Sequence, residues 1–111
     1  MTITWQDFEK VDIRIGTIVE VDHFPKARNP AFILHVDFGI EIGLKKSSSQ
    51  ITDLYTKDQL QGKQVIAVVN FEPKQVGPII SECLVLGFYR QDNSVVLATN
   101  DLPISNGSRL L

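Results

Sequence analysis

The sequence predicts an all-β domain with one short helix, and two observations carry that prediction. Apolar and polar residues alternate along Val11–Val21, a period of two that indicates a strand with one buried face. Two apolar runs, Val65–Val69 and Glu82–Gly87, flank a polar connector over residues 70–81. Two buried strands that share a polar edge indicate a binding platform more than a catalytic centre.

Length and composition indicate one globular domain, over residues 1–111. The chain has 111 residues, of which 43% are hydrophobic and 22% charged. It contains no run of about 18 apolar residues, so we expect no membrane insertion. The first ten residues lack the basic and apolar regions of a secretory signal, so the expected compartment is the cytoplasm.

The N-terminal residues 1–10 are expected to form a helical turn. Thr4 can cap it, and Asp7 stands in the capping-box position three residues later. Trp5 and Phe8 would then share one face and need something to cover, either the end of the barrel or a second subunit.

The first strand, Val11–Val21, places Val19 on its apolar face, whereas Ile18 breaks the pattern. Gly16 in the middle of the strand indicates a bulge or a sharp bend there.

The remaining elements follow in an order typical of an OB-fold. A loop (Phe24–Pro30) is followed by two strands (Ala31–Phe38 and Ile42–Ile51) and by a short helix (Tyr55–Gly62) that Thr56 caps. The two apolar runs named above come next, and then a turn (Asp92–Ser94) and a last strand candidate (Ser94–Ala98). We therefore predict a Greek-key barrel of five strands with N- and C-terminal extensions.

Searches for catalytic and metal-binding patterns argue against an enzyme. The chain has no phosphate-binding glycine loop, no serine-nucleophile motif and no Cys-x-x-Cys, and His23 and His35 stand on different elements. The single cysteine, Cys83, lies in an apolar run and is interpreted as a small buried hydrophobe. We therefore predict no catalytic residue, no metal site and no cofactor.

The net charge of −2 argues against binding of a nucleic acid, because such domains usually carry an excess of basic residues. A nucleic-acid partner would therefore have to be bound by local clusters of lysine and arginine. An OB barrel could bring them to one side, although ordinary surface lysines are the alternative. They are Arg14, Lys26, Arg28, Lys45, Lys46 and Lys74. The hydroxyl-rich strand beside Lys45 could add hydrogen-bond donors for a phosphate or a base edge.

Five blocks in order resemble the tRNA-binding domain family. They are V-D-I-R-I-G-T-I-V-E-V, F-P-K-A-R-N-P-A-F, I-G-L-K-K-S-S-S-Q-I, L-Q-G-K-Q-V-I-A-V-V-N-F-E-P-K and S-E-C-L-V-L-G. Within that family the chain is most similar to the CsaA-type secretion chaperones, and the similarity covers roughly residues 5–111.

The resemblance implies an OB-fold homodimer that binds tRNA by its shape. For CsaA-type members it also implies binding of preproteins or unfolded polypeptide, with the export machinery as a possible partner. By position, the polar binding edge of the family corresponds to Asn70, Lys74, Ser81 and Glu82, with Arg14 and the strand that carries Ser48 beside it.

Two apolar groups complete the prediction. Phe71, Ile79 and Ile80 are candidate walls of a groove for extended polypeptide. A dimer interface is expected from both extensions, residues 1–10 and 99–111, although the tail could instead cover its own barrel. Its candidate residues are Trp5, Phe8, Leu102, Ile104 and Leu110.

Overall fold

A computed structural model describes residues 1–24 and 30–111, so the predicted RNA-binding residues Lys26 and Arg28 lie outside the described residues. The helices are α1 (Trp5–Glu9), α2 (Gly39–Ile42) and α3 (Lys57–Leu60), and the strands are β1 (Ile13–His23), β2 (Phe32–Asp37), β3 (Leu44–Ser49), β4 (Gln64–Val68), β5 (Lys74–Val76), β6 (Ile79–Ser81), β7 (Leu84–Val85), β8 (Gly87–Tyr89) and β9 (Val95–Leu97).

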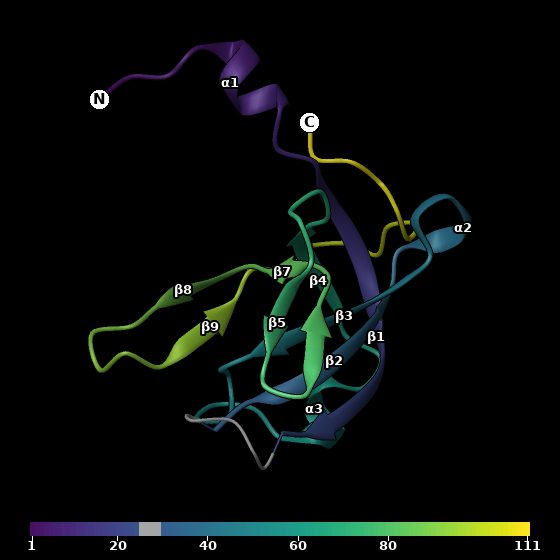
Figure 1. The fold of residues 1–111 in the computed structure, drawn as a ribbon, viewed down its shortest axis with the longest axis vertical. Helices are drawn as coiled ribbons and strands as arrows, with labels where there is room; N and C mark the ends of the chain where they lie inside the picture. The colour runs from purple at the N-terminus through teal and green to yellow at the C-terminus, as the bar shows by residue number, and fades with distance from the viewer. Residues whose placement is uncertain (25–29) are drawn as a thin grey trace.

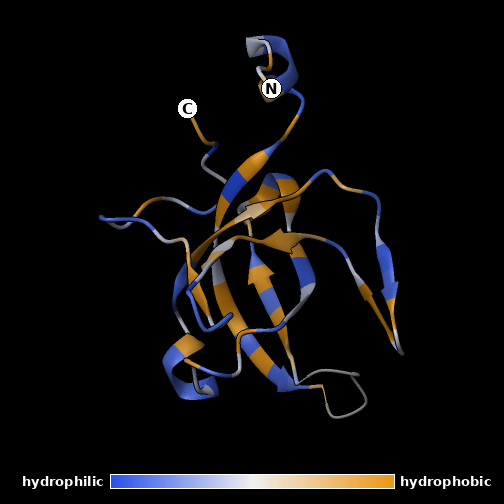
Figure 2. Cartoon of the chain, turned by 90° about the vertical axis from the view of Figure 1, so that its left-hand side faces the viewer, coloured by the Kyte–Doolittle hydropathy of each residue, from blue (hydrophilic) through white to orange (hydrophobic). Residues whose placement is uncertain are grey.

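The central element is an antiparallel sheet with the strand order β3-β2-β1-β4-β7, which curls into a nearly closed barrel (Figure 1). Two separate hairpins, β5–β6 and β8–β9, leave this barrel. Hydrophobic and hydrophilic residues alternate along the barrel strands, as Figure 2 shows. The predicted OB-fold-like barrel is therefore confirmed.

The barrel interior is filled by side chains from the strands and from α3. Ile18, Leu34, Val36 and Phe38 are fully buried, and Leu60 closes one end of the barrel from α3. α3 begins where predicted, because the Thr56 hydroxyl accepts the N–H of Gln59 in a capping box. A full capping box, between Thr4 and Asp7, also starts α1.

The path of β1 differs from the prediction at two residues. The bulge lies between Ile18 and Glu20, whereas the pairing with β4 is regular across Gly16. A bulge adds one residue to a strand and reverses the inside–outside pattern beyond it. Ile18 before the bulge and Val21 after it therefore both point into the core, and Val19 lies 41% exposed, so Ile18 and Val19 are the opposite of the predicted arrangement.

Gly16 is needed for close packing and not for a bulge. A Cβ atom at this position would lie 2.6 Å from Val36 Cγ1 and 2.7 Å from Phe38 Cδ1. The absence of a side chain leaves room for these two large residues, which lie on and directly after the neighbouring strand β2, to fill the barrel.

Three further predictions were wrong in detail. Ser47 and Ser49 are buried, and their hydroxyls bond to each other at 3.2 Å, so they are not surface donors. The connector over 70–81, in which no strand was predicted, contains the β5–β6 hairpin, with Gly77 at its tip. The predicted strand Glu82–Gly87 is divided, because its last residue starts the β8–β9 hairpin.

The β8–β9 hairpin projects to the side of the barrel (Figure 1). Its turn is the predicted Asp92–Ser94, in which the Asp92 carboxylate accepts both the N–H and the hydroxyl of Ser94, at 3.0 and 2.6 Å. These bonds lower the pKa of Asp92, with the hydroxyl bond contributing most. Asn93 takes the positive φ of 69° that the tight turn requires.

The variant Gly16→Ala tests the close approach of Gly16 to Val36 and Phe38. We expect a loss of about 1–3 kcal/mol in the free energy of unfolding, because the added methyl group displaces Val36 and Phe38. Denaturant unfolding measures it, with the exposed Val19→Ala on the same strand as control. An unchanged midpoint for Gly16→Ala would contradict this packing argument.

Candidate nucleic-acid interface

The barrel closes where the outer edge of β3 meets the chain between β6 and β7. The N–H of Glu82 donates to the Lys46 carbonyl at 2.7 Å, which is a ladder bond between backbones. The next two bonds use side chains. The N–H of Lys46 donates to Glu82 Oε1 at 3.0 Å, and the N–H of Ser48 donates to Ser81 Oγ at 3.2 Å. We call these four residues the closing seam.

Cys83 lies just inside the closing seam. Its thiol is 6% exposed and reaches toward the Lys46 carbonyl, with Sγ to oxygen at 3.8 Å. Burial raises the pKa of Cys83 to about 12, and the nearby negative charge of Glu82 adds to the shift. The thiol is therefore protonated at neutral pH, in agreement with its prediction as a buried hydrophobe.

A pocket of about 630 Å³ opens beside the closing seam, and we call it the seam pocket. It brings together four of the predicted RNA-binding residues and one predicted peptide-binding residue. Its lining is Ser48, Gln50, Phe71, Glu72, Lys74, Val76, Ser81, Glu82, Cys83 and Leu84. Because β3, the β5–β6 hairpin and the seam all contribute, the pocket exists only in the closed barrel.

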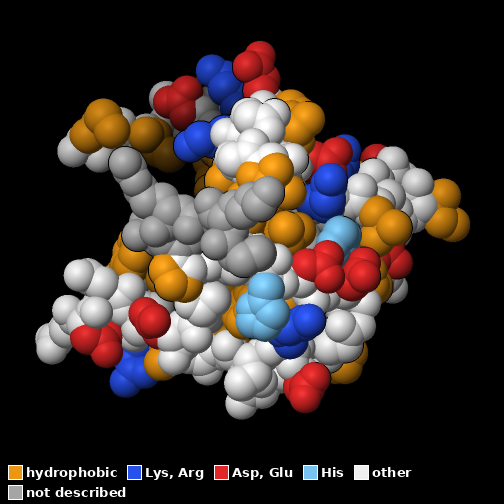
Figure 3. Space-filling model, turned by 60° about the horizontal axis from the view of Figure 1, so that its bottom comes forward, with side chains coloured by type: hydrophobic (Ala, Val, Ile, Leu, Met, Phe, Trp, Pro, Cys, Tyr) orange, Lys and Arg blue, Asp and Glu red, His pale blue; other side chains and the backbone are white. Residues whose placement is uncertain are grey.

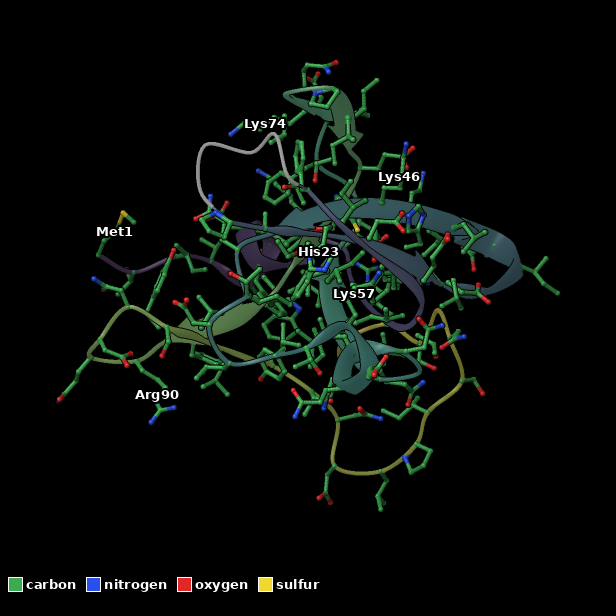
Figure 4. All side chains as sticks on the ribbon, turned by 90° about the horizontal axis from the view of Figure 1, so that it is seen from below. Met1, His23, Lys46, Lys57, Lys74 and Arg90 are labelled. Carbon is green, nitrogen blue, oxygen red and sulfur yellow. The ribbon has the colours of Figure 1, made fainter. Side chains whose placement is uncertain are left out.

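Three predicted lysines lie around this region. Lys45 and Lys46 are half-buried on β3, and Lys74 is exposed at the start of β5. Lys46 and Lys74 lie on the same side of the molecule in Figure 4, away from Arg90. Among the described residues, none of these three ammonium groups takes part in an ion pair. They are therefore free to meet an anionic partner.

The surface near β2 is not uniformly basic. Lys46 pairs across the sheet with His35, whose Nε2 lies 2.9 Å from Asp22 Oδ2 and 3.7 Å from Glu20 Oε2. One ring nitrogen of His35 and one carboxylate oxygen each of Glu20 and Asp22 lie within 4.8 Å of one another, and His35 and Asp22 are joined by a hydrogen bond. Acidic and basic side chains are interspersed on the face shown in Figure 3.

Arg14 and Asn70 lie apart from the seam pocket and hold the two chain ends to the barrel. Arg14 donates to both carboxylate oxygens of Asp12 and to the carbonyl of Gly107, at 2.9 Å. The bond to Asp12 raises the pKa of Arg14. The Asn70 amide accepts the N–H of Asp12 and donates to the Lys10 carbonyl, at 3.0 and 2.8 Å. Both side chains already have partners within the protein, and a role for them in RNA binding remains a prediction.

The predicted peptide-binding residues are divided between two surfaces. Phe71 is 57% exposed and lines the seam pocket, whereas Ile79 and Ile80 lie on β6 outside that lining. Ile80 is 47% exposed and Ile79 is half-buried. The structure does not join these three residues into one groove.

The predicted dimer residues gather at the two chain ends. α1 stands away from the barrel, near the C-terminus (Figure 1). Its Trp5 ring packs on Phe8 at 5.5 Å between centroids, yet remains 63% exposed. A groove of about 550 Å³ between β1 and the tail is lined in part by Leu102, Ile104 and Leu110. Each of these three is at least 45% exposed.

The β5–β6 hairpin is the element beside the seam pocket that the sequence analysis did not predict. The signal was present in Val76-Gly77-Pro78-Ile79, where a Gly-Pro pair separates two apolar residues. Pairing of Lys74 with Ser81 across this hairpin places both beside the seam pocket.

Comparison with known proteins agrees with this architecture. The family model described as "Putative tRNA binding domain" matches residues 13–109. The chain belongs to this family. The family is defined by binding and is not a catalytic one. No helix in the described part of the chain is long and apolar enough to cross a membrane.

Similar proteins fall into two groups. The chain is 33% identical over 106 residues to a methionine–tRNA ligase of Flavobacterium psychrophilum, covering 95% of this chain but only 15% of that protein. Two solved chaperone structures match nearly end to end. CsaA of Bacillus anthracis is 42% identical, with a TM-score of 0.94 and full coverage of both chains. CsaA of Picrophilus torridus is 49% identical, with a TM-score of 0.93, and covers 99% of this chain and 100% of that one.

The raised pKa of Cys83 predicts a specific dependence of stability on pH. Between the ordinary thiol pKa of 9.0 and about 12, the unfolded chain has lost this proton while the folded chain retains it. The free energy of unfolding should therefore fall as the pH rises through this window. Denaturant unfolding between pH 8 and pH 11 measures the fall.

The control for this prediction is Cys83→Val, which removes the titrating group and keeps a small apolar side chain. We expect a shallower alkaline decline in the variant than in the wild type. Equal declines would show that the thiol is not held protonated in the folded barrel.

Proposed function

We propose that this tRNA-binding domain acts as a homodimer that recognises tRNA structure through the side of the barrel formed by β3 and the β5–β6 hairpin. The observation that carries the proposal is the family match over residues 13–109. The geometry supports it, because Ser48, Lys74, Ser81 and Glu82 line one pocket and Lys45 and Lys46 continue along β3.

The charge of the chain explains why assembly would matter. With a net charge of −2, one copy attracts RNA only through local lysines. Two linked copies would double the phosphate contacts and raise the overall affinity without any new kind of contact. Recognition of shape and 2′-hydroxyls, without a base-by-base code, suits such a shallow surface.

A second function, as an export chaperone for preproteins or unfolded polypeptide, is favoured by a different observation. The two CsaA chaperone structures match the whole chain at 42% and 49% identity, whereas the ligase match covers a small part of a long protein. The exposed side chains of Phe71 and Ile80 offer apolar contacts for an extended segment.

Removing two lysines tests the RNA-binding surface. The double variant Lys45→Ala/Lys74→Ala should weaken binding of labelled tRNA and lower the slope of log affinity against log salt by about one per lysine that contacts a phosphate. Titrations at roughly 50 and 200 mM salt measure both quantities.

The matched control is Lys57→Ala/Lys63→Ala, which removes the same charge from α3 and the segment after it. It should bind nearly as the wild type does. Equal losses in the two double variants would show that binding follows net charge and not this surface. Binding that does not change with salt would refute the proposed electrostatic contact.

The dimer is tested by placing a charge among the exposed apolar residues of the tail. Sedimentation equilibrium of the wild type should give twice the chain mass of 12.4 kDa. Leu110→Asp should give a monomer, because burying an unpaired carboxylate is costly. Ile40→Asp, at a fully exposed position on α2, should remain dimeric. A monomeric wild type would exclude the homodimer.

The chaperone function is tested by light scattering of a chemically denatured client diluted with and without the protein. We expect less aggregation with the wild type, and less protection when Phe71 and Ile80 are both replaced by Ser, because both exposed apolar contacts are removed. Aggregation that the wild type leaves unchanged would contradict this function, whatever the outcome with tRNA.

A further inference from the structure

We propose that the seam pocket holds a single unpaired nucleobase of the bound RNA and prefers guanine. This inference rests on the proposed RNA-binding function and adds to it a specific subsite. It implies that the RNA is recognised by shape along the lysines and by one base at the seam.

The dimensions and walls of the pocket suit a flat ring. Its volume of about 630 Å³ lies in the range of roughly 300–1,000 Å³ that small-molecule sites occupy. The Phe71 ring, 57% exposed, forms one wall, and Val76 and Leu84 add apolar surface. Unpaired bases in RNA complexes commonly stack on such aromatic side chains, and each stacked base strengthens binding.

The charges of the pocket favour a base over a phosphate. Among the described residues of its lining, two carboxylates, those of Glu72 and Glu82, lie with one ammonium group, that of Lys74. A phosphate inside would meet more like charge than opposite charge. The exposed Lys74 can instead meet the phosphate of the same nucleotide outside, while the interior accepts a group that donates hydrogen bonds.

Glu82 supplies the acceptor for that group. Its Oε1 is fixed by the backbone N–H of Lys46 at 3.0 Å, which holds the carboxylate in one orientation. Within the described residues, no hydrogen bond or ion pair reaches its second oxygen, Oε2. Guanine presents an N–H and an NH₂ side by side on its Watson–Crick edge, which is open only when the base is unpaired. Uracil presents one N–H between two carbonyls, which a carboxylate repels.

The same groups disfavour an apolar side chain of a polypeptide. An apolar side chain would strip water from the Glu82 carboxylate without offering it a donor, which is unfavourable. A lysine or arginine side chain would supply donors to Glu82 but would also meet the Lys74 ammonium group in the same lining, and a titration with a trilysine peptide separates this occupant from a base.

A substitution at Glu82 in the closing seam can separate the role of this residue in stability from its role in binding a base. Glu82→Gln keeps an oxygen for the Lys46 N–H but presents NH₂ in place of an acceptor, so stability should be retained and the guanine preference lost. Glu82→Ala removes both functions and should also lower the unfolding midpoint. Glu41→Gln, the same change at an exposed position on α2, is the matched control.

The experiment is an NMR titration of ¹⁵N-labelled protein with guanosine and uridine monophosphates. We expect the guanine nucleotide to shift amide signals of Ser48, Phe71 and Cys83 and to bind about tenfold more tightly than the uridine nucleotide. Glu82→Gln should lose about tenfold in affinity for the guanine nucleotide, and Glu41→Gln should lose none.

Three outcomes would overturn the inference: no shift around the seam pocket, equal affinity for both nucleotides, or wild-type binding by Glu82→Gln. Shifts caused by a trilysine peptide but not by the guanine nucleotide would also overturn it and assign the pocket to polypeptide. The same samples are titrated with tRNA. Binding of tRNA without a nucleotide response rejects the base subsite alone, whereas a guanine-specific response without tRNA binding supports the subsite and rejects the proposed function.

Discussion

The barrel depends on two side-chain oxygens that take the place of a missing strand. β3 has no complete neighbour on its outer edge, and the N–H groups of Lys46 and Ser48 would remain unpaired there without Glu82 and Ser81. A fully buried donor without a partner costs about 1–3 kcal/mol, and a half-buried donor costs less because water can reach it. By satisfying both donors, the closing seam shields Cys83 and positions the β5–β6 hairpin beside β3.

The polar edge that the family resemblance marks for binding is therefore also a structural edge. Ser81, Glu82 and Asn70 each bond to backbone groups of distant segments, so their replacement acts on the fold as well as on a ligand. Lys74, by contrast, has no ion-pair partner among the described residues and lies exposed. A loss of binding in a variant of Ser81, Glu82 or Asn70 can be interpreted only if the stability of the variant is measured as well. A loss of binding in a Lys74 variant reflects lost contact with the partner directly.

Sequence patterns predicted the features that depend on local chemistry. The capping box of Thr4 and the cap of Thr56 depend on residues within one turn of the chain, and the alternation along β1 needs only burial on one side. The errors arose from tertiary contacts. The bulge after Ile18, which leaves Val19 outside the core, belongs to the pairing with β2, and the buried hydroxyls of Ser47 and Ser49 satisfy each other. The seam pocket needs three distant segments and could be foreseen only through the family resemblance.

The position of Trp5 has a spectroscopic consequence. It is the single tryptophan of the chain, and it lies on the short helix that stands away from the barrel. Its indole is 63% in contact with solvent, so its emission reports on the surroundings of this helix and hardly on the barrel core. The emission maximum of this intrinsic fluorophore should shift to shorter wavelength when another surface covers the helix, so no added label is needed.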